Sequence, residues 1–216
     1  MINLLQAIAE PSSAILCFIL AWFMIKPYRL TGEASFLGLP LGFGIMGIGH
    51  VIATIAAFSY EVSWFMLLFR TFSFVFLAMT YLFSGKFSKT YQQFWNIALS
   101  MLVVALIVLS LIFVITPQPL GDYYNTASIY YRIFIGICLL YIVAHTLRTH
   151  LKKPDPNTLW IPLGFILLAI SQYSFILFYI NQSSPAAWGG IVFRFSGLIM
   201  FLLVSWRTFF SKKEFG

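Results

Sequence analysis

Three arginines, Arg70, Arg132 and Arg194, each lie in an otherwise apolar stretch, at equal intervals of 62 residues. A guanidinium in the middle of a membrane-spanning segment costs about 2.5–3.5 kcal/mol on insertion scales, so three of them require compensation. A planar guanidinium offers paired donors that match a carboxylate or a phosphate. These residues therefore predict either ion pairs inside the protein or a site for an anionic group.

Three further polar residues in apolar stretches can join the arginines, namely Glu10, His50 and Gln172. With the topology argued below, six helices place one such group at nearly the same depth, in the outer half of the bilayer. Arg194 shares a helical stripe with Gly190, and small residues usually mark the protein-facing side of a membrane helix. We therefore predict a ligand-binding layer made of Glu10, His50, Arg70, Arg132, Gln172 and Arg194.

Internal neutralisation is the competing interpretation of this layer. The acids Glu10, Glu61 and Asp122 equal the three arginines in number, so each arginine has an acid available within the chain. In that interpretation the polar layer stabilises the fold and binds nothing. The sequence leaves both interpretations open.

The remaining reactive side chains form no recognisable catalytic or metal-binding pattern. His145 and His150 lie near the inner end of one segment, far in depth from His50, which argues against a haem or zinc site. Cys17 and Cys138 lie within apolar segments and are expected to be packing thiols. We therefore expect no enzyme, no cofactor and no metal.

The amino-acid composition indicates which class of protein contains these polar side chains. Of the 216 residues, 61% are hydrophobic and 9% charged, whereas a soluble domain is about 25% charged. A spanning helix needs about 20 apolar residues. The sequence therefore predicts an all-α, polytopic membrane protein with one domain over residues 1–216. Its seven transmembrane helices are expected near 3–25, 36–58, 63–84, 94–115, 127–147, 159–180 and 187–206.

The basic residues predict how the chain is oriented. Ten of the 13 fall in alternate connections and the C-terminal tail: Lys26, Arg29, Lys86, Lys89, Arg148, Lys152, Lys153, Arg207, Lys212 and Lys213. Short loops rich in Lys and Arg stay cytoplasmic, the positive-inside rule, so we expect the N-terminus outside and the C-terminus in the cytoplasm. The expected location is the plasma membrane. The basic face is expected to attract anionic lipids, and no nucleic-acid-binding module is present.

Two patterns involve glycine. Gly42, Gly44 and Gly47 match the spacing GxGxxG, but inside an apolar segment they predict close helix packing, not dinucleotide binding. The sequence PLGF at 40–43 recurs at 162–165. With the 62-residue arginine interval, this recurrence suggests a repeat in which one helix is followed by three hairpins.

These features together predict a binding or sensor-like, receptor-like membrane protein. It would accept a small anionic or amphiphilic ligand from the outer side and contact a cytoplasmic partner through its basic face. The first alternative is an accessory subunit that packs against other subunits of a larger membrane complex. The second is a small transporter. The last apolar segment contains no lysine for a Schiff base, which argues against retinal binding.

Overall fold

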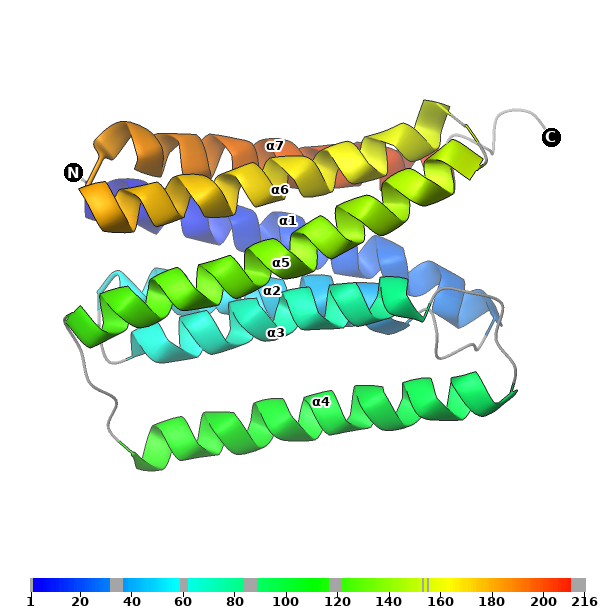
Figure 1. Ribbon diagram of the computed structural model, residues 1–216, viewed down its shortest axis with the longest axis horizontal. Helices are drawn as coiled ribbons and strands as arrows, with labels where there is room; N and C mark the ends of the chain where they lie inside the picture. The colour runs from blue at the N-terminus through cyan, green and yellow to red at the C-terminus, as the bar shows by residue number, and fades with distance from the viewer. Residues whose placement is uncertain are drawn as a thin grey trace. The chain divides into compact units, whose positions relative to one another are not determined.

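The computed structural model describes residues 2–31, 37–58, 62–83, 89–116, 122–152, 154 and 156–210, and in them it contains seven α-helices and no β-strand. All seven helices are long and apolar enough to cross a membrane. The predicted all-α, multi-pass architecture is thereby confirmed. In Figure 1 the helices are α1 (Ile2–Thr31), α2 (Gly38–Ala56), α3 (Ser63–Leu82), α4 (Lys89–Ile115), α5 (Asp122–Lys152), α6 (Pro156–Asn181) and α7 (Ser184–Phe210).

Most helices continue past the apolar segments predicted for them. Helix α5 spans 31 residues, whereas the sequence predicts a segment near 127–147. The length of an apolar segment matches the thickness of the hydrocarbon core of the bilayer. The helix itself can extend beyond this core, because its hydrogen bonding continues through polar residues with good helix propensity. As a result Arg29, Arg148 and Lys152, predicted in connections, lie in the last turns of helices. The orientation of the chain stays a prediction.

The chain divides into two compact units, residues 1–131 and 132–216. The first unit contains α1 to α4 and the first turns of α5. The second contains the rest of α5, together with α6 and α7.

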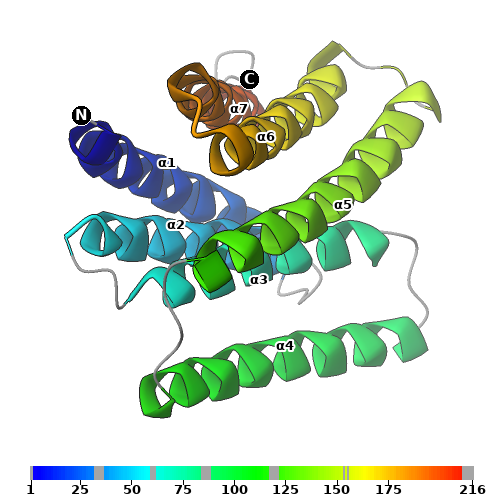
Figure 2. The same ribbon diagram turned by 60° about the vertical axis from the view of Figure 1, so that its left-hand side comes forward.

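In the first unit, α2 packs against both α1 and α3 (Figure 2). Glycine allows both close approaches. A Cβ atom at Gly42 would come within 2.6 Å of the Leu77 side chain on α3, and one at Gly47 within 2.8 Å of the Phe18 ring on α1. Two of the three glycines in the GxGxxG pattern therefore serve helix packing, as predicted. The third, Gly44, has open space around it.

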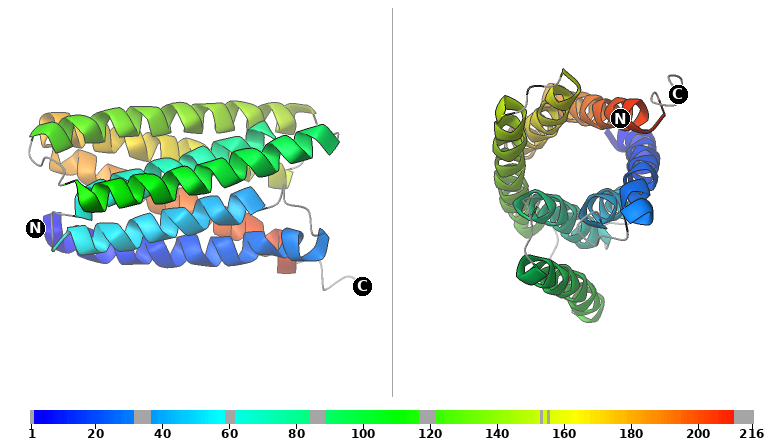
Figure 3. Two further views of the ribbon diagram at one scale, coloured as in Figure 1. Left: turned by 90° about the horizontal axis from the view of Figure 1, so that it is seen from below. Right: turned by 90° about the vertical axis from the view of Figure 1, so that its right-hand side faces the viewer.

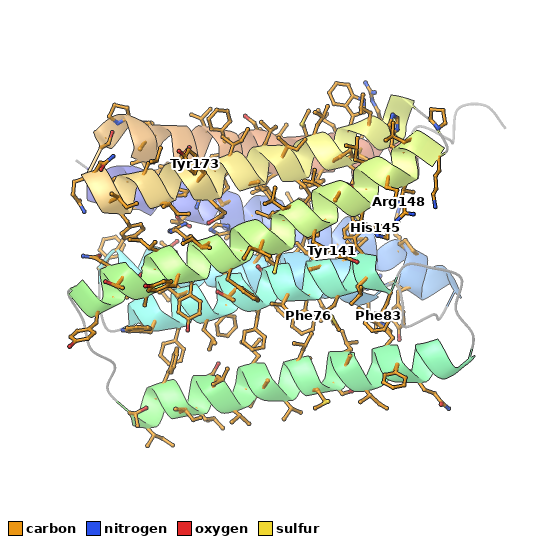
Figure 4. All side chains as sticks on the ribbon, viewed as in Figure 1. Phe76, Phe83, Tyr141, His145, Arg148 and Tyr173 are labelled. Atoms are coloured by element: carbon orange, nitrogen blue, oxygen red, sulfur yellow. The ribbon has the colours of Figure 1, made fainter. Side chains whose placement is uncertain are left out.

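Helix α4 lies against α3 at the edge of this unit (Figure 3). Its contact is apolar: Leu106 packs in a cluster with Phe76, which is fully buried on α3. Near the other end of the contact, the rings of Phe83 and Trp95 are 5.4 Å apart, and Figure 4 labels Phe76 and Phe83 between the two helices. Most of α4 is exposed and strongly apolar, as expected of a lipid-facing helix.

In the second unit, α6 and α7 pack tightly side by side. Ser171 on α6 donates a 2.7 Å hydrogen bond to the carbonyl of Gly190 on α7. A Cβ atom at Gly197 would lie 2.9 Å from the carbonyl oxygen of Gly164, so the two backbones are nearly in contact there. Close approach of this kind is how small residues stabilise membrane helix pairs.

We expect the substitution Gly197→Ala to reduce the stability of the protein by about 1–3 kcal/mol, because the added methyl must push α6 and α7 apart. Gly136→Ala is the matched control, since no atom lies within 4 Å of a Cβ at that position. Thermal unfolding in neutral lipid nanodiscs, followed by tryptophan fluorescence, measures both variants. Equal losses from the two substitutions would contradict the close approach.

Candidate functional site

Glu10, His50 and Arg70, from three different helices, form one buried cluster in the first unit. The Nη2 of Arg70 donates a 2.6 Å hydrogen bond to Oε2 of Glu10. The His50 Nδ1 lies 2.5 Å from the same oxygen and 3.2 Å from Arg70 Nη2. All three residues are less than a tenth exposed. Three of the six predicted residues thus form an ion pair with a histidine in contact.

The helix packing explains why these side chains meet. Gly49 precedes His50 on α2, and a Cβ there would lie 3.3 Å from Cγ of Arg70. A larger residue at this position would crowd the arginine stem. On α3, the Ser73 hydroxyl donates to the Arg70 carbonyl at 2.7 Å. The close contact between α2 and α3 thus leaves space for the arginine to reach Glu10 on α1.

Hydrogen-bond chemistry pairs the charges of Arg70 and Glu10. Arg70 can only donate, and its short contact to Glu10 suits an ionised carboxylate. The His50 Nδ1 lies within hydrogen-bonding distance of the same carboxylate oxygen. For Arg70, the interpretation of internal neutralisation fits the geometry.

The second unit contains a different cluster, built on Arg132 of α5. Its Nη1 donates to Oε1 of Gln172 on α6 at 2.9 Å. The guanidinium carbon lies 4.7 Å from the centre of the Phe175 ring and 5.2 Å from that of Tyr179. Arg132 thus extends from α5 to a polar and aromatic face of α6.

Arg194 of α7 approaches the same phenylalanine. Its guanidinium carbon lies 5.8 Å from the centre of the Phe175 ring and 6.0 Å from that of Phe195. Because both guanidinium carbons lie near the same ring, the distance between them is at most 10.5 Å, the sum of their distances to the Phe175 ring centre. Both arginines are 4% exposed. Two buried cations thus lie against one ring.

The contacts of the second cluster named above join guanidinium groups to a neutral amide and to aromatic rings. Such groups stabilise a guanidinium by about 1–2 kcal/mol each. The first cluster, in contrast, joins its arginine to a carboxylate.

The six predicted site residues thus fall into two clusters of three, one in each unit. Their role as ligand-binding residues stays a prediction. Glu61 lies outside the described residues, and so does the side chain of Asp122. Sequence reasoning missed Phe175 and Tyr179. The sequence spacing could have identified them, because they follow Gln172 by three and seven residues and so share its helical face.

The other histidines and the cysteines lie apart from these clusters. In Figure 4, Tyr141, His145 and Arg148 follow one another along the last turns of α5, and the Tyr141 and His145 rings are 6.3 Å apart. Within the part of the chain that the structure describes, no three His, Cys, Asp or Glu residues are placed to hold a metal ion. Cys17 is buried on α1, and Cys138 is partly exposed on α5.

A pocket of about 60 Å³ lies between α6 and α7 and is lined by Trp160, Met200, Leu203, Val204 and Arg207. Arg207 follows Arg194 by 13 residues, or about 20 Å along the helix axis. The pocket is lined mostly by apolar side chains, and Arg207 is exposed. It is therefore separate from the arginine cluster and typical of a lipid-contacting surface.

The chain matches no protein-family model, no curated protein and no solved structure.

Proposed function

We propose that this integral membrane protein binds a small oxyanion, a carboxylate or a phosphate carried on an apolar body, at Arg132, Arg194 and Gln172. One observation carries the proposal: two buried arginines from different helices approach one phenylalanine ring, beside a glutamine amide.

The chemistry of the second cluster suits such a ligand. Each guanidinium can donate two parallel hydrogen bonds to a carboxylate or phosphate, and charge-assisted bonds of this kind contribute about 1.5–3 kcal/mol each. The Gln172 amide adds a further polar group. The rings of Phe175 and Tyr179 provide apolar surface for the rest of the ligand. An inorganic anion alone would leave those rings unused.

Helix geometry indicates from which end a ligand reaches the site. Arg132 and Arg194 each lie ten residues after the first residue of their helix, or about 15 Å along the axis. Gln172 lies nine residues before the end of α6. With the predicted topology these helix ends face outward. The proposed protein therefore takes its ligand from outside the cell and acts as a sensor-like receptor.

A small carrier is the second candidate, because Pro162 interrupts the hydrogen-bond ladder inside α6, the helix that holds Gln172. Interrupted helices that meet at a polar site near mid-membrane are typical of transporters. Exchange of labelled benzoate across the membrane of proteoliposomes separates the two candidates. A carrier exchanges it, and a receptor binds without exchange.

The proposed function is tested with benzoate, which joins a carboxylate to an apolar ring, and with benzamide as its neutral counterpart. In nanodiscs of phosphatidylcholine, a hundredfold excess of benzoate over its Kd is expected to stabilise the protein by about 2.7 kcal/mol, which raises the Tm by about 5–10 °C. Benzamide is expected to leave the Tm unchanged.

A second set of nanodiscs, containing phosphatidylglycerol, distinguishes a free anion from a lipid headgroup. If the headgroup is the natural oxyanion, this lipid raises the Tm by itself and benzoate adds little. If a soluble anion is the ligand, benzoate raises the Tm equally in both lipids. An unchanged Tm under benzoate and under the anionic lipid would overturn the proposed function.

A further inference from the structure

We infer that the pocket between α6 and α7 binds an anionic phospholipid, with the headgroup phosphate at Arg207 and one acyl chain along the apolar wall of the pocket. The apolar wall consists of Trp160, Met200, Leu203 and Val204. This site is distinct from the oxyanion site proposed above, because Arg207 lies about 20 Å along α7 from Arg194. Neither proposal depends on the other.

The lining residues place a cation at one end of the pocket and apolar side chains along the rest. Trp160 lies four residues after the first residue of α6 and Arg207 three residues before the last residue of α7, so both lie at one end of the helix pair. Met200 lies about 10 Å further along α7 from this end than Arg207. Trp160 and Leu203 are 42% and 56% exposed, so the apolar wall is open to lipid. A cation followed by an apolar wall suits an amphiphile.

Charge complementarity favours an anionic headgroup at this end. Arg207 is exposed, so its guanidinium can donate two parallel hydrogen bonds to a phosphate. Arginine and tryptophan side chains near the ends of membrane helices lie at the level of the lipid headgroups. With the predicted topology this end faces the cytoplasm, where the leaflet contains anionic lipids and each nearby Lys or Arg attracts them about fivefold.

Recurring contacts relate α6 and α7 to α2 and α3. Gly42 of α2 lies against the Leu77 side chain of α3. In the same way Gly164 of α6 lies against the Phe201 ring of α7. The two glycines belong to the recurring PLGF sequence and are 122 residues apart, and their partners are 124 apart. Positions of α6 thus correspond to those of α2 by an offset of 122, and positions of α7 to those of α3 by an offset of 124.

By these offsets, the pocket corresponds to the surface of the first unit against which α4 packs. The residues equivalent to its five lining residues are Gly38, Phe76, Met79, Thr80 and Phe83. Phe76 packs in one cluster with Leu106 of α4. The Phe83 ring lies 5.4 Å from that of Trp95, also on α4. In the first unit, therefore, an apolar group that can span the bilayer occupies the equivalent surface.

Two replacements in the second unit favour an acyl chain over a helix as its occupant. A Cβ atom at Gly38 would lie 3.0 Å from the Trp95 ring, so this glycine leaves room for α4. The second unit has Trp160 at this position, and an approaching helix would meet an indole that α4 does not meet. A flexible acyl chain can enter the pocket that remains, of about 60 Å³. At the other position Arg207 replaces Phe83, which adds a cation for an anionic head.

Native mass spectrometry of the protein released from nanodiscs tests this inference, because it counts the lipids that stay bound. In nanodiscs with equal amounts of phosphatidylcholine and phosphatidylglycerol, the wild type is expected to retain phosphatidylglycerol about fivefold in preference, since phosphatidylcholine carries no net charge. Arg207→Gln is expected to abolish this preference. Arg148→Gln is the matched control, because Arg148 is an exposed arginine near the end of α5 that does not line the pocket. Equal losses in the two variants, or no preference in the wild type, would overturn the inference.

The variant Val204→Phe tests the apolar wall, because it puts a ring in the pocket and keeps Arg207. It is expected to reduce retention of phosphatidylglycerol as much as Arg207→Gln does. Its Tm in phosphatidylcholine checks that it folds, and Leu203→Trp, at a 56% exposed position, replaces it if it does not. Retention at the wild-type level in a folded variant of this kind would show that charge alone attracts the lipid, and would overturn the inference.

Two further measurements identify the source of the phosphate and the site that binds it. Glycerol 3-phosphate has the headgroup chemistry without acyl chains and is expected not to displace the lipid. Displacement would assign the pocket to a free phosphate and overturn the inference. The double variant Arg132→Gln with Arg194→Gln is expected to retain phosphatidylglycerol as the wild type does. A loss of retention there would assign the lipid to the oxyanion site, so the two proposals can fail separately.

Discussion

Replacing Glu10 by Gln is expected to lower the free energy of unfolding by about 3–5 kcal/mol, the largest effect of any single substitution considered for this protein. Arg70 cannot lose its proton, so the variant leaves a buried guanidinium beside neutral groups. The glutamine keeps the volume of the side chain and a hydrogen bond to His50. The loss therefore reports the charge and not a cavity. Thermal and denaturant unfolding in neutral nanodiscs measure it.

The variant Arg70→Met is the matched comparison. Glu10 can take up a proton when its counter-ion is removed, and the His50 contact remains, so a smaller loss is expected. The double variant Glu10→Gln with Arg70→Met buries no charge in this cluster and should recover most of the stability, because replacing a buried ion pair by neutral groups is often close to neutral. Additive losses in the double variant would show that Glu10 and Arg70 do not stabilise one another.

Arg132→Gln and Arg194→Gln are each expected to weaken benzoate binding by about tenfold to a hundredfold, since each removes a charge-assisted hydrogen bond. Each is expected to reduce the stability of the ligand-free protein less than Glu10→Gln does, because the substitution removes a buried charge and does not leave one unpaired in its own place. The loss of binding is therefore expected to exceed the loss of stability. Titration calorimetry and unfolding experiments on the same samples measure both quantities.

Arg194→Lys is the control for geometry. It keeps the charge but has a compact ammonium that cannot present two parallel donors, so we expect an affinity between those of the wild type and of Arg194→Gln. If Arg132→Gln or Arg194→Gln lost stability as Glu10→Gln does, while benzoate affinity stayed unchanged, these arginines would be structural and the proposed site would be wrong.

The number of helices could be predicted because membrane insertion depends on apolar length, which a single sequence reports directly. The helix ends could not, because helical structure continues past the bilayer core into polar turns, as in α1 and α5. The roles of Gly42 and Gly47 in packing were also predictable, since glycine within an apolar segment favours close contact between helices.

The members of the polar layer could be predicted, but not their partners. Depth along each helix placed Glu10, His50 and Arg70 at one level, yet depth alone does not determine which side chains face one another. That choice depends on packing, such as the approach of Gly49 to the arginine stem. The sequence likewise counted as many acids as arginines, and only the geometry assigns Glu10 to Arg70.

The most direct test of the oxyanion site is a solid-state NMR distance measurement. It uses benzoate labelled with ¹³C at the carboxyl group and protein labelled with ¹⁵N at the arginine guanidinium groups, in neutral lipid. We predict dipolar contact at about 4 Å, the separation of a paired guanidinium and carboxylate, and its loss in the double variant Arg132→Gln with Arg194→Gln. No contact in the wild type, or a contact that survives in this double variant, would contradict the site.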